Sequence, residues 1–362
     1  MTKPIALALG LLLCLTALTA AGNGEDPLIS LSYLTGDFSA TLDAAISAKL
    51  DASDEAIRAG WSQTPPSDGS AEAPGISGLV ERTLKEGDVL SGSTGLSLTP
   101  LGGDVRLDAA GAVVDVTEGA EVSSGQLLRQ NHRYIVAEDA AVSFVVASPA
   151  AVVSYEGGGT LALSLAPDYY AMSCALRELN LFQGSGSGIG EGFDLYKAPS
   201  RGEGLVMFLR ILGEEEQALA SGGGHPFTDV PGWLDPYVSW AYQRGYANGI
   251  AAGKFGCTQP ISAIEYEEFL LRALGYSTVG VDDYSTSLER ALACGALTAG
   301  EYEVLRSGGF LRAHVAYISY YALDMPVNGS ENTLAQRLTA AEVMTEEQLV
   351  QARSQVNSSR IS

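Results

Sequence analysis

The chain has 362 residues, of which 21 are basic and 43 are acidic, so its formal net charge is −22 at pH 7. This excess of carboxylates argues against a nucleic-acid partner, because binding to phosphates needs a basic surface. The length predicts two or more domains.

Residues 1–21 have the pattern of a secretory signal peptide. Lys3 supplies a positive charge, an apolar run extends from Ile5 to Leu18, and small residues follow at positions 19–22. The run is shorter than the roughly 20 apolar residues that a membrane-spanning helix needs, and no later stretch is long and apolar enough. We therefore expect a secreted protein without a transmembrane segment in its mature chain.

Residues 22–78 are predicted to form an N-terminal segment of mixed character. Leu28–Tyr33 has the composition of a short strand, and Ser39–Arg58 is rich in alanine and typical of a helix. Gln63–Gly75 is rich in Pro, Ser, Gly and Ala, which indicates a linker.

Residues 79–165 are predicted to form a small antiparallel β domain. Short β-branched segments alternate there with turn signals at Gly87-Asp88, Gly102-Gly103, Glu118-Gly119 and Gly157–Gly159. The predicted strands are Leu96–Leu98, Val105–Leu107, Val113–Val116, Tyr134–Ala137, Val142–Val146 and Val152–Tyr155. The sequence of this domain indicates no function.

Residues 166–327 have helical periodicity, and the pattern occurs three times. Registers that start at Gly204, Tyr266 and Val315 place mainly apolar residues three, four, seven and eight positions further on. Each segment therefore presents one apolar stripe along a helix face. The fold class we expect is α+β, in which an N-terminal helical segment and a small β domain precede an all-α body.

The predicted ends of these helices agree with the shared register. Ser200–Glu203 and Ser262–Glu265 are capping boxes, in which a Ser and a Glu satisfy unpaired amides at a helix start. Gly213 and Gly275 are suited to the left-handed conformation that ends a helix. The third copy has Leu311 at the cap position and Asp324 at the end, so we expect its helix to start less sharply.

Another helical segment precedes each stripe helix and ends near Asn180, Gly245 and Gly295. The unit is therefore helix, loop, helix, over about 166–214, 225–276 and 281–325. Units this small cannot bury their apolar faces alone, so we expect them to pack into one body. The tail at 328–362 contains a predicted helix at Ala340–Gln351.

The middle copy carries the most specific motifs. The stretch His225–Pro231 reads His-Pro-Phe-Thr-Asp-Val-Pro, and Trp233, Gly245, Gly249, Pro260-Ile261 and Arg272–Gly275 follow in order. This order resembles an S-layer homology (SLH) repeat of the Gram-positive type. The resemblance covers a little under half of the chain, is close for the middle copy and is weakest for the third.

The resemblance implies a pseudo-threefold helical body that binds secondary cell-wall polysaccharide, commonly pyruvylated, in grooves between repeats. The groove-lining Thr-Arg-Ala-Glu motif of the family falls on Ser200–Glu203, which retains the arginine as Arg201. The third copy retains it as Arg312, whereas the second has Ala263. Because the wall polymers are anionic and the chain is acidic, binding must depend on local arginines and lysines. We expect the loss at Ala263 to weaken or abolish one groove.

The candidate binding residues each have a second interpretation. An arginine in the first turn of a capped helix can offer a planar pair of donors to a sugar carboxylate, but Arg201 and Arg312 are equally well explained as solvated helix-end charges. Trp233 is a candidate for sugar stacking or for packing between repeats. The full candidate set is Arg201, Glu203, Arg312, Trp233, Asp229 and Lys254.

A catalytic function has little support in the sequence. His132, His225 and His314 are scattered, no nucleophile elbow is present, and the glycine-rich run 184–190 lacks the spacing of a nucleotide site. We expect a non-catalytic protein without a cofactor or metal, located at the cell wall or S-layer. The alternative is a secreted glycan-binding or adhesin-like protein in which degenerate repeats are only structural.

Overall fold

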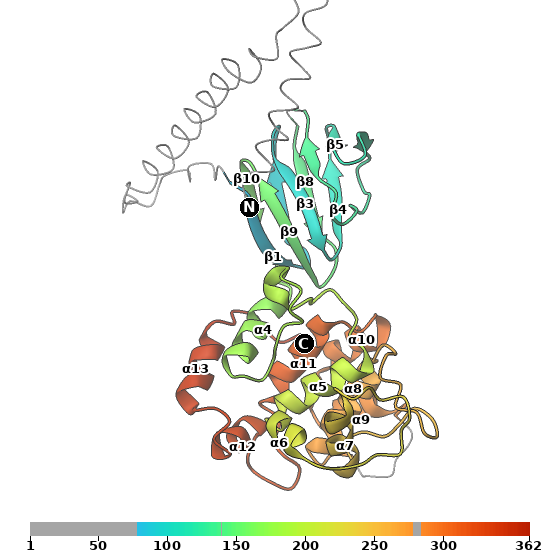
Figure 1. Cartoon of the computed structure of the whole chain (residues 1–362). Coiled ribbons are helices and arrows are strands. Elements are labelled where there is room, and N and C mark those ends of the chain that lie inside the picture. The colour runs from blue at the N-terminus through green and yellow to red at the C-terminus, as the bar shows by residue number, and fades with distance from the viewer. Residues whose placement is uncertain (1–77, 139, 278–283) are drawn as a thin grey trace, which may run out of the picture. The chain divides into compact units, whose positions relative to one another are not determined.

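The computed structural model describes residues 78–138, 140–277 and 284–362. In this part of the chain, antiparallel sheets are followed by a helical region, as Figure 1 shows, so the expected α+β class is confirmed. The predicted signal peptide at 1–21 and almost all of the predicted N-terminal segment at 22–78 lie outside the described residues.

The β domain consists of two antiparallel sheets. One sheet has the strand order β1-β9-β3-β7-β5-β6, and the other has the order β10-β2-β8-β4. The strands are β1 (Val80–Lys85), β2 (Val89–Gly92), β3 (Ser97–Gly102), β4 (Val105–Ala109), β5 (Val113–Asp115), β6 (Ala120–Val122), β7 (Tyr134–Val136), β8 (Val142–Val146), β9 (Ala150–Glu156) and β10 (Gly159–Ala162).

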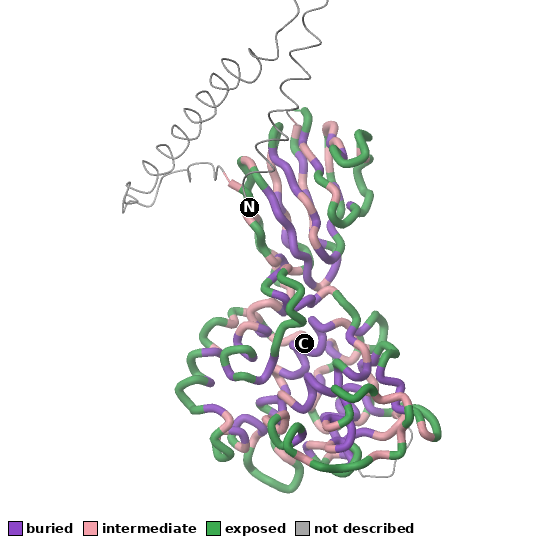
Figure 2. Tube along the Cα trace, in the orientation of Figure 1, coloured by how far each residue is buried: buried purple, intermediate pink, exposed green. Residues whose placement is uncertain are grey.

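The two sheets share one hydrophobic core. In β8, Val142, Phe144 and Val146 are buried and the residues between them are less so, which is the period of two expected for a strand with one covered face. Leu98 and Val153 contribute from the other sheet to the same core. Figure 2 shows buried positions running along these strands, so the domain is a sandwich of two sheets.

All six predicted strands are present, but four further strands, β1, β2, β6 and β10, were not predicted. Gly87, Gly103, Gly119 and Gly157 have positive φ angles, so the turn signals are correct. The missed strands contain charged residues, serine or glycine, as in Val-Glu-Arg-Thr-Leu-Lys of β1. Their composition is therefore not typical of strands. Pairing with a neighbour compensates for this weak propensity, because β1 forms a continuous antiparallel ladder with β9.

The helical region contains three helix pairs, which we call the first (α4 and α5), second (α7 and α8) and third (α9 and α11) pair. The helices are α4 (Tyr169–Glu178), η1 (Gly190–Gly192), α5 (Arg201–Ile211), α6 (Glu215–Ala220), α7 (Asp235–Gln243), α8 (Ala263–Ala273), α9 (Ser287–Ala293), α10 (Ala299–Ser307), α11 (Arg312–Ala322), α12 (Leu334–Ala340) and α13 (Glu346–Ser354). Contacts of α5 with α7, α8 and α11, of α4 with α11, and of α8 with α9 bring all three pairs into one body.

The second helix of each pair starts at the predicted position. The N-caps are Ser200, Ser262 and Leu311, and both serine capping boxes are formed. As predicted, the N-cap side chain of α11 accepts no hydrogen bond from a first-turn amide. Leucine has no side-chain acceptor, but the Leu311 N–H donates to His314 Nδ1 at 3.0 Å, which supplies half of a capping box. Burial lowers the pKa of His314 to about 4, so the neutral ring can accept this bond.

The first helix of each pair ends in the same way. Asn180, Gly245 and Gly295 follow α4, α7 and α9, and all three have positive φ angles. The left-handed residue turns the chain into the loop that leads to the second helix. Helix α6, between the first and second pairs, and helix α10, between the two helices of the third pair, were not predicted. The tail helix predicted at 340–351 is instead two helices, because the Thr345 side chain starts α13 after α12 has ended.

The capping serine of α5 gives a first test of this local structure. We expect Ser200→Ala to lower the free energy of unfolding by about 1 kcal/mol, because the Glu203 N–H loses its side-chain acceptor. Ser200→Asp restores an acceptor and should remain close to the parent protein. Urea denaturation followed by circular dichroism measures both, and equal losses in the two variants would contradict a capping role.

Candidate functional site

The N-terminus of α5 is inserted into the second helix pair. The Arg201 N–H donates to the Gln259 carbonyl at 2.7 Å, and the Gly202 N–H donates to the Cys257 carbonyl at 3.0 Å. These carbonyls lie three and five residues before the capping Ser262 of α8. Unpaired amides at a helix start need acceptors, and here the neighbouring pair provides them. We call this contact the first junction.

The N-terminus of α11 meets the first helix pair in the same register. The Arg312 N–H donates to the Lys197 carbonyl at 2.9 Å, and the Ala313 N–H donates to the Leu195 carbonyl at 3.0 Å. Lys197 and Leu195 lie three and five residues before the capping Ser200. This contact, the third junction, therefore repeats the geometry of the first junction.

The side chain of Arg201 fills the first junction. It is 1% exposed, and its Nη1 and Nη2 atoms donate to Glu265 Oε1 at 2.5 Å and to the Asn248 carbonyl at 2.9 Å. The guanidinium also lies over the rings of Phe255 and Phe269, 5.1 Å from each centroid. Arg201 thus joins α5 to the second helix pair by charge, hydrogen bonds and cation–π contacts.

Arg312 fills the third junction in the same manner. It is 6% exposed, its Nε donates to the Phe193 carbonyl at 2.8 Å, and its Nη2 donates to the Gln183 carbonyl at 3.2 Å. Gln183 lies three residues after Asn180, as Asn248 lies three residues after Gly245. The two arginines therefore use equivalent acceptors on neighbouring pairs.

The second junction, between α8 and the third pair, is built differently. Its first-turn residues are Ala263 and Ile264, and a groove of about 680 Å³ lies beside them. Among the described residues, neither the Ala263 nor the Ile264 N–H has a protein hydrogen-bond acceptor. The carbonyls that would accept by register belong to Gly308 and Arg306, which line the groove without bonding to these amides.

Helix α10 changes the carbonyl that an arginine would use at this junction. The residue three positions after Gly295 is Thr298, and its carbonyl accepts the Tyr302 N–H at 3.0 Å in the first turn of α10. The carbonyl equivalent to the acceptors of Arg201 and Arg312 therefore already accepts one hydrogen bond within α10. Ala263 takes the place of the arginine at this junction, and the additional helix α10 begins after Thr298. Both differences leave space at the second junction.

The groove has an apolar floor and a polar rim. Leu288, Leu305 and Phe310 contribute apolar surface, whereas Ser262, Glu289, Tyr302 and Arg306 are polar. The Tyr302 hydroxyl donates to Glu289 Oε1 at 3.0 Å, and the Arg306 guanidinium lies 5.6 Å from the Tyr302 ring centroid. Sequence reasoning missed these residues. The capping box Thr298–Glu301 was the available signal, since it marks an extra helix before α11.

The structure does not bring the six predicted binding residues together. Arg201 and Arg312 occupy different junctions, and neither presents an exposed pair of donors as the sequence suggested. The interpretation of both as solvated helix-end charges is also excluded by their burial. Glu203 is exposed and bonds the Ser200 N–H within its own capping box.

The other three predicted residues are near the entry of the second pair. Asp229 accepts the Phe255 and Gly256 N–H groups at 2.8 and 2.9 Å. Burial acts to raise its pKa, but these hydrogen bonds outweigh it and keep the pKa below its ordinary value. Lys254 is exposed, with its Nζ 3.4 Å from Thr228 Oγ1. Trp233 is 61% exposed, so it is not packed between helix pairs, and it does not line the groove.

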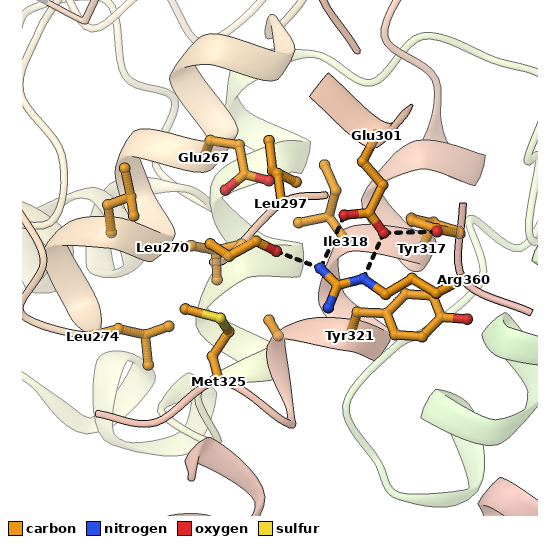
Figure 3. Close-up of a pocket in the computed structure, with 13 residues that line it drawn as sticks. Glu267, Leu270, Leu274, Leu297, Glu301, Tyr317, Ile318, Tyr321, Met325 and Arg360 are labelled. Atoms are coloured by element: carbon orange, nitrogen blue, oxygen red, sulfur yellow. Dashed lines mark hydrogen bonds and ion pairs between the residues drawn. The ribbon is translucent and has the colours of Figure 1, made fainter. Parts of the chain in front are cut away.

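A second polar cluster lies between α8, α10 and α11 (Figure 3). Arg360 pairs with Glu301 from Nε at 2.7 Å and from Nη2 at 2.9 Å, and the Tyr317 hydroxyl donates to Glu301 at 2.8 Å. Glu267 faces the same cavity, and its Oε1 has no partner. The cavity holds about 10 Å³, which is the space of about one water molecule. The cluster is therefore internal packing and too small for a ligand.

Because Arg201 fills the first junction, we expect its replacement to lower the free energy of unfolding strongly. Arg201→Met should lower the free energy of unfolding by about 3 kcal/mol, because Glu265 Oε1 and the Asn248 carbonyl each lose the hydrogen bond that Arg201 donates. The matched control is Arg306→Met, which changes an exposed arginine and should leave stability unchanged. Urea denaturation compares the two variants, and equal effects would refute the junction role.

The buried Glu267 carboxyl is expected to make the free energy of unfolding depend on pH. Burial, with a smaller contribution from the charge of Glu301, raises its pKa from 4.5 to about 8. Below pH 4.5 the side chain is neutral in both states. Between pH 4.5 and 8 it ionises only in the unfolded state, so its contribution to stability falls by up to about 1.4 kcal/mol per pH unit and levels off above pH 8.

Glu267→Gln keeps the shape of the neutral acid and removes this titration. The variant should match the parent protein near pH 4 and be more stable near pH 9, by about 3 to 5 kcal/mol. Urea denaturation of both proteins across this pH range measures the difference between their free energies of unfolding. Groups that titrate in the same way in both proteins do not contribute to this difference. A difference that does not change with pH would contradict a neutral buried Glu267.

Comparison with known proteins leaves the function to be argued from this geometry. No helix in the described part of the chain is long and apolar enough to cross a membrane. In the same residues, no group of three or more His, Cys, Asp or Glu side chains is arranged to hold a metal ion. No protein-family model matches the chain, and no curated protein matches it.

Proposed function

We propose that this chain is a non-catalytic cell-surface protein that is held at the bacterial cell wall by secondary cell-wall polysaccharide, which binds at the second junction. The three helix pairs are three degenerate SLH-type repeats. The protein is secreted, and its β domain is a structural or adhesive part. The observation that carries the proposal is the open groove beside the free Ala263 and Ile264 amides.

The repeat interpretation is supported by details that composition alone does not produce. Each pair has a left-handed residue after its first helix and an 11-residue second helix that starts in the same register. Two of the three junctions use the same backbone bonds and an equivalent arginine. Such agreement is expected of copies of one ancestral unit that pack around a common axis.

The groove suits a saccharide for three reasons. Its volume of about 680 Å³ lies within the range of small-molecule sites. Its apolar floor and the Tyr302 ring fit the apolar face of a sugar, and the polar rim fits hydroxyl groups. The Ala263 and Ile264 amides, at the start of a helix, are suited to a carboxylate or hydroxyl oxygen. These two amides and the Arg306 guanidinium are hydrogen-bond donors of residues that line the same groove.

A wall pull-down tests the proposal. The purified chain should sediment with Gram-positive sacculi that retain their secondary polymer and should stay in solution after the polymer has been extracted. Tyr302→Ala should weaken binding by roughly fivefold or more, which is the usual effect of losing an aromatic contact. Tyr242→Ala removes a tyrosine outside the groove and is the matched control.

A second variant separates the groove from the junction arginines. Ala263→Arg places a long side chain in the groove and should abolish wall binding, whereas Ala263→Ser should leave it intact. Thermal unfolding must show that both variants remain folded. If the parent protein binds neither form of the wall, the alternative holds, in which a secreted glycan-binding or adhesin-like protein uses its repeats only as structure.

A further inference from the structure

A second pocket lies away from the groove, where α12 packs near the end of α5 and near α7. It has a volume of about 350 Å³ and is lined by Glu214, Trp240, Arg244, Tyr246 and Arg337, together with Gln217 and apolar residues. None of these residues takes part in a junction or in the groove. The pocket is therefore independent of the proposed wall-binding site.

The pocket contains two arginines that no carboxylate neutralises. Neither Arg244 nor Arg337 forms an ion pair with an acidic side chain of the described residues. Glu214 lines the same pocket, but its oxygens accept hydrogen bonds from Trp240 Nε1 at 2.8 Å and from the Tyr246 hydroxyl at 3.1 Å. In a chain with a net charge of −22, two neighbouring arginines without acidic partners are unexpected.

The arrangement of both arginines leaves donors available. The Arg244 guanidinium lies over the Trp240 ring, 4.2 Å from its centroid, and stacking of this kind fixes the plane while its N–H edge stays accessible. The Nη2 atom of Arg337 is buried and has no hydrogen-bond partner. A buried donor without a partner destabilises a protein, and an oxygen atom of a bound ligand would supply the acceptor that Nη2 lacks.

We infer that this pocket binds an oxyanion, a carboxylate or phosphate group on a small molecule or sugar residue, through Arg244 and Arg337. A guanidinium donates two parallel hydrogen bonds to either group, and both groups fit the available volume. Trp240 supplies an apolar surface beside the anion. The pocket differs in this respect from the groove, where backbone amides and a mixed rim surround the opening.

Calorimetric titration of the full chain with three probes tests the inference. Inorganic phosphate and glucuronate represent the two anion classes, and glucose is the uncharged control. We expect saturable binding of at least one anion, weaker binding at higher ionic strength, and no binding of glucose. Arg244→Gln and Arg337→Gln should each weaken anion binding by roughly tenfold or more, because each removes charge-assisted hydrogen bonds.

The controls keep the result independent of folding and of wall binding. Arg129→Gln changes an exposed arginine of the β domain, outside both the pocket and the groove, and should retain the anion affinity of the parent protein. Arg244→Lys with Arg337→Lys keeps both charges, and its affinity should fall between those of the parent protein and the double Gln variant. The inference is overturned if neither anion binds, if glucose binds equally well, or if the folded double Gln variant keeps the parent affinity.

Discussion

The helical body depends on backbone hydrogen bonds between helix pairs. At two of the three junctions, one pair supplies carbonyl acceptors for the amides that start the second helix of its neighbour. At the first and third junctions, loop carbonyls accept two of these amides and a buried arginine completes the contact. A helix of 11 residues has too little surface to be stable alone. The insertion of its N-terminus into the next pair therefore fixes both the helix and the angle between pairs. The rest of the body, including the groove, follows from where this contact is made and where it is not.

Much of this arrangement could be predicted from local patterns. The apolar stripes, the Ser200 and Ser262 capping boxes and the left-handed Gly213 and Gly275 depend on neighbouring residues, and the structure has each of them. Strands with alternating β-branched residues were also found, because burial on one face leaves a period of two in the sequence. Weakly apolar strands such as β1 and β6 were missed, since pairing rather than composition stabilises them.

The site itself could not be predicted in this way. The sequence marks Arg201 and Arg312 as positions of interest but does not reveal that both are buried, because burial depends on carbonyls from another pair. The absence of arginine at Ala263 suggested a lost groove, whereas the structure has its open groove at that position. The reason is long-range, since Arg201 and Arg312 fill the first and third junctions, whereas the second junction has Ala263 and the additional helix α10.

The unequal junctions have a mechanical consequence. At the second junction the first-turn amides of α8 make no bond to the described residues of the third pair, and the two pairs are joined by side chains such as Glu268, which bonds Arg290 and Ser287. The groove lies across that contact, between α8 and α10. A ligand that binds there bridges the two sides and stabilises the closed form by mass action. Occupancy of the groove and resistance of the body to being pulled open are therefore thermodynamically linked.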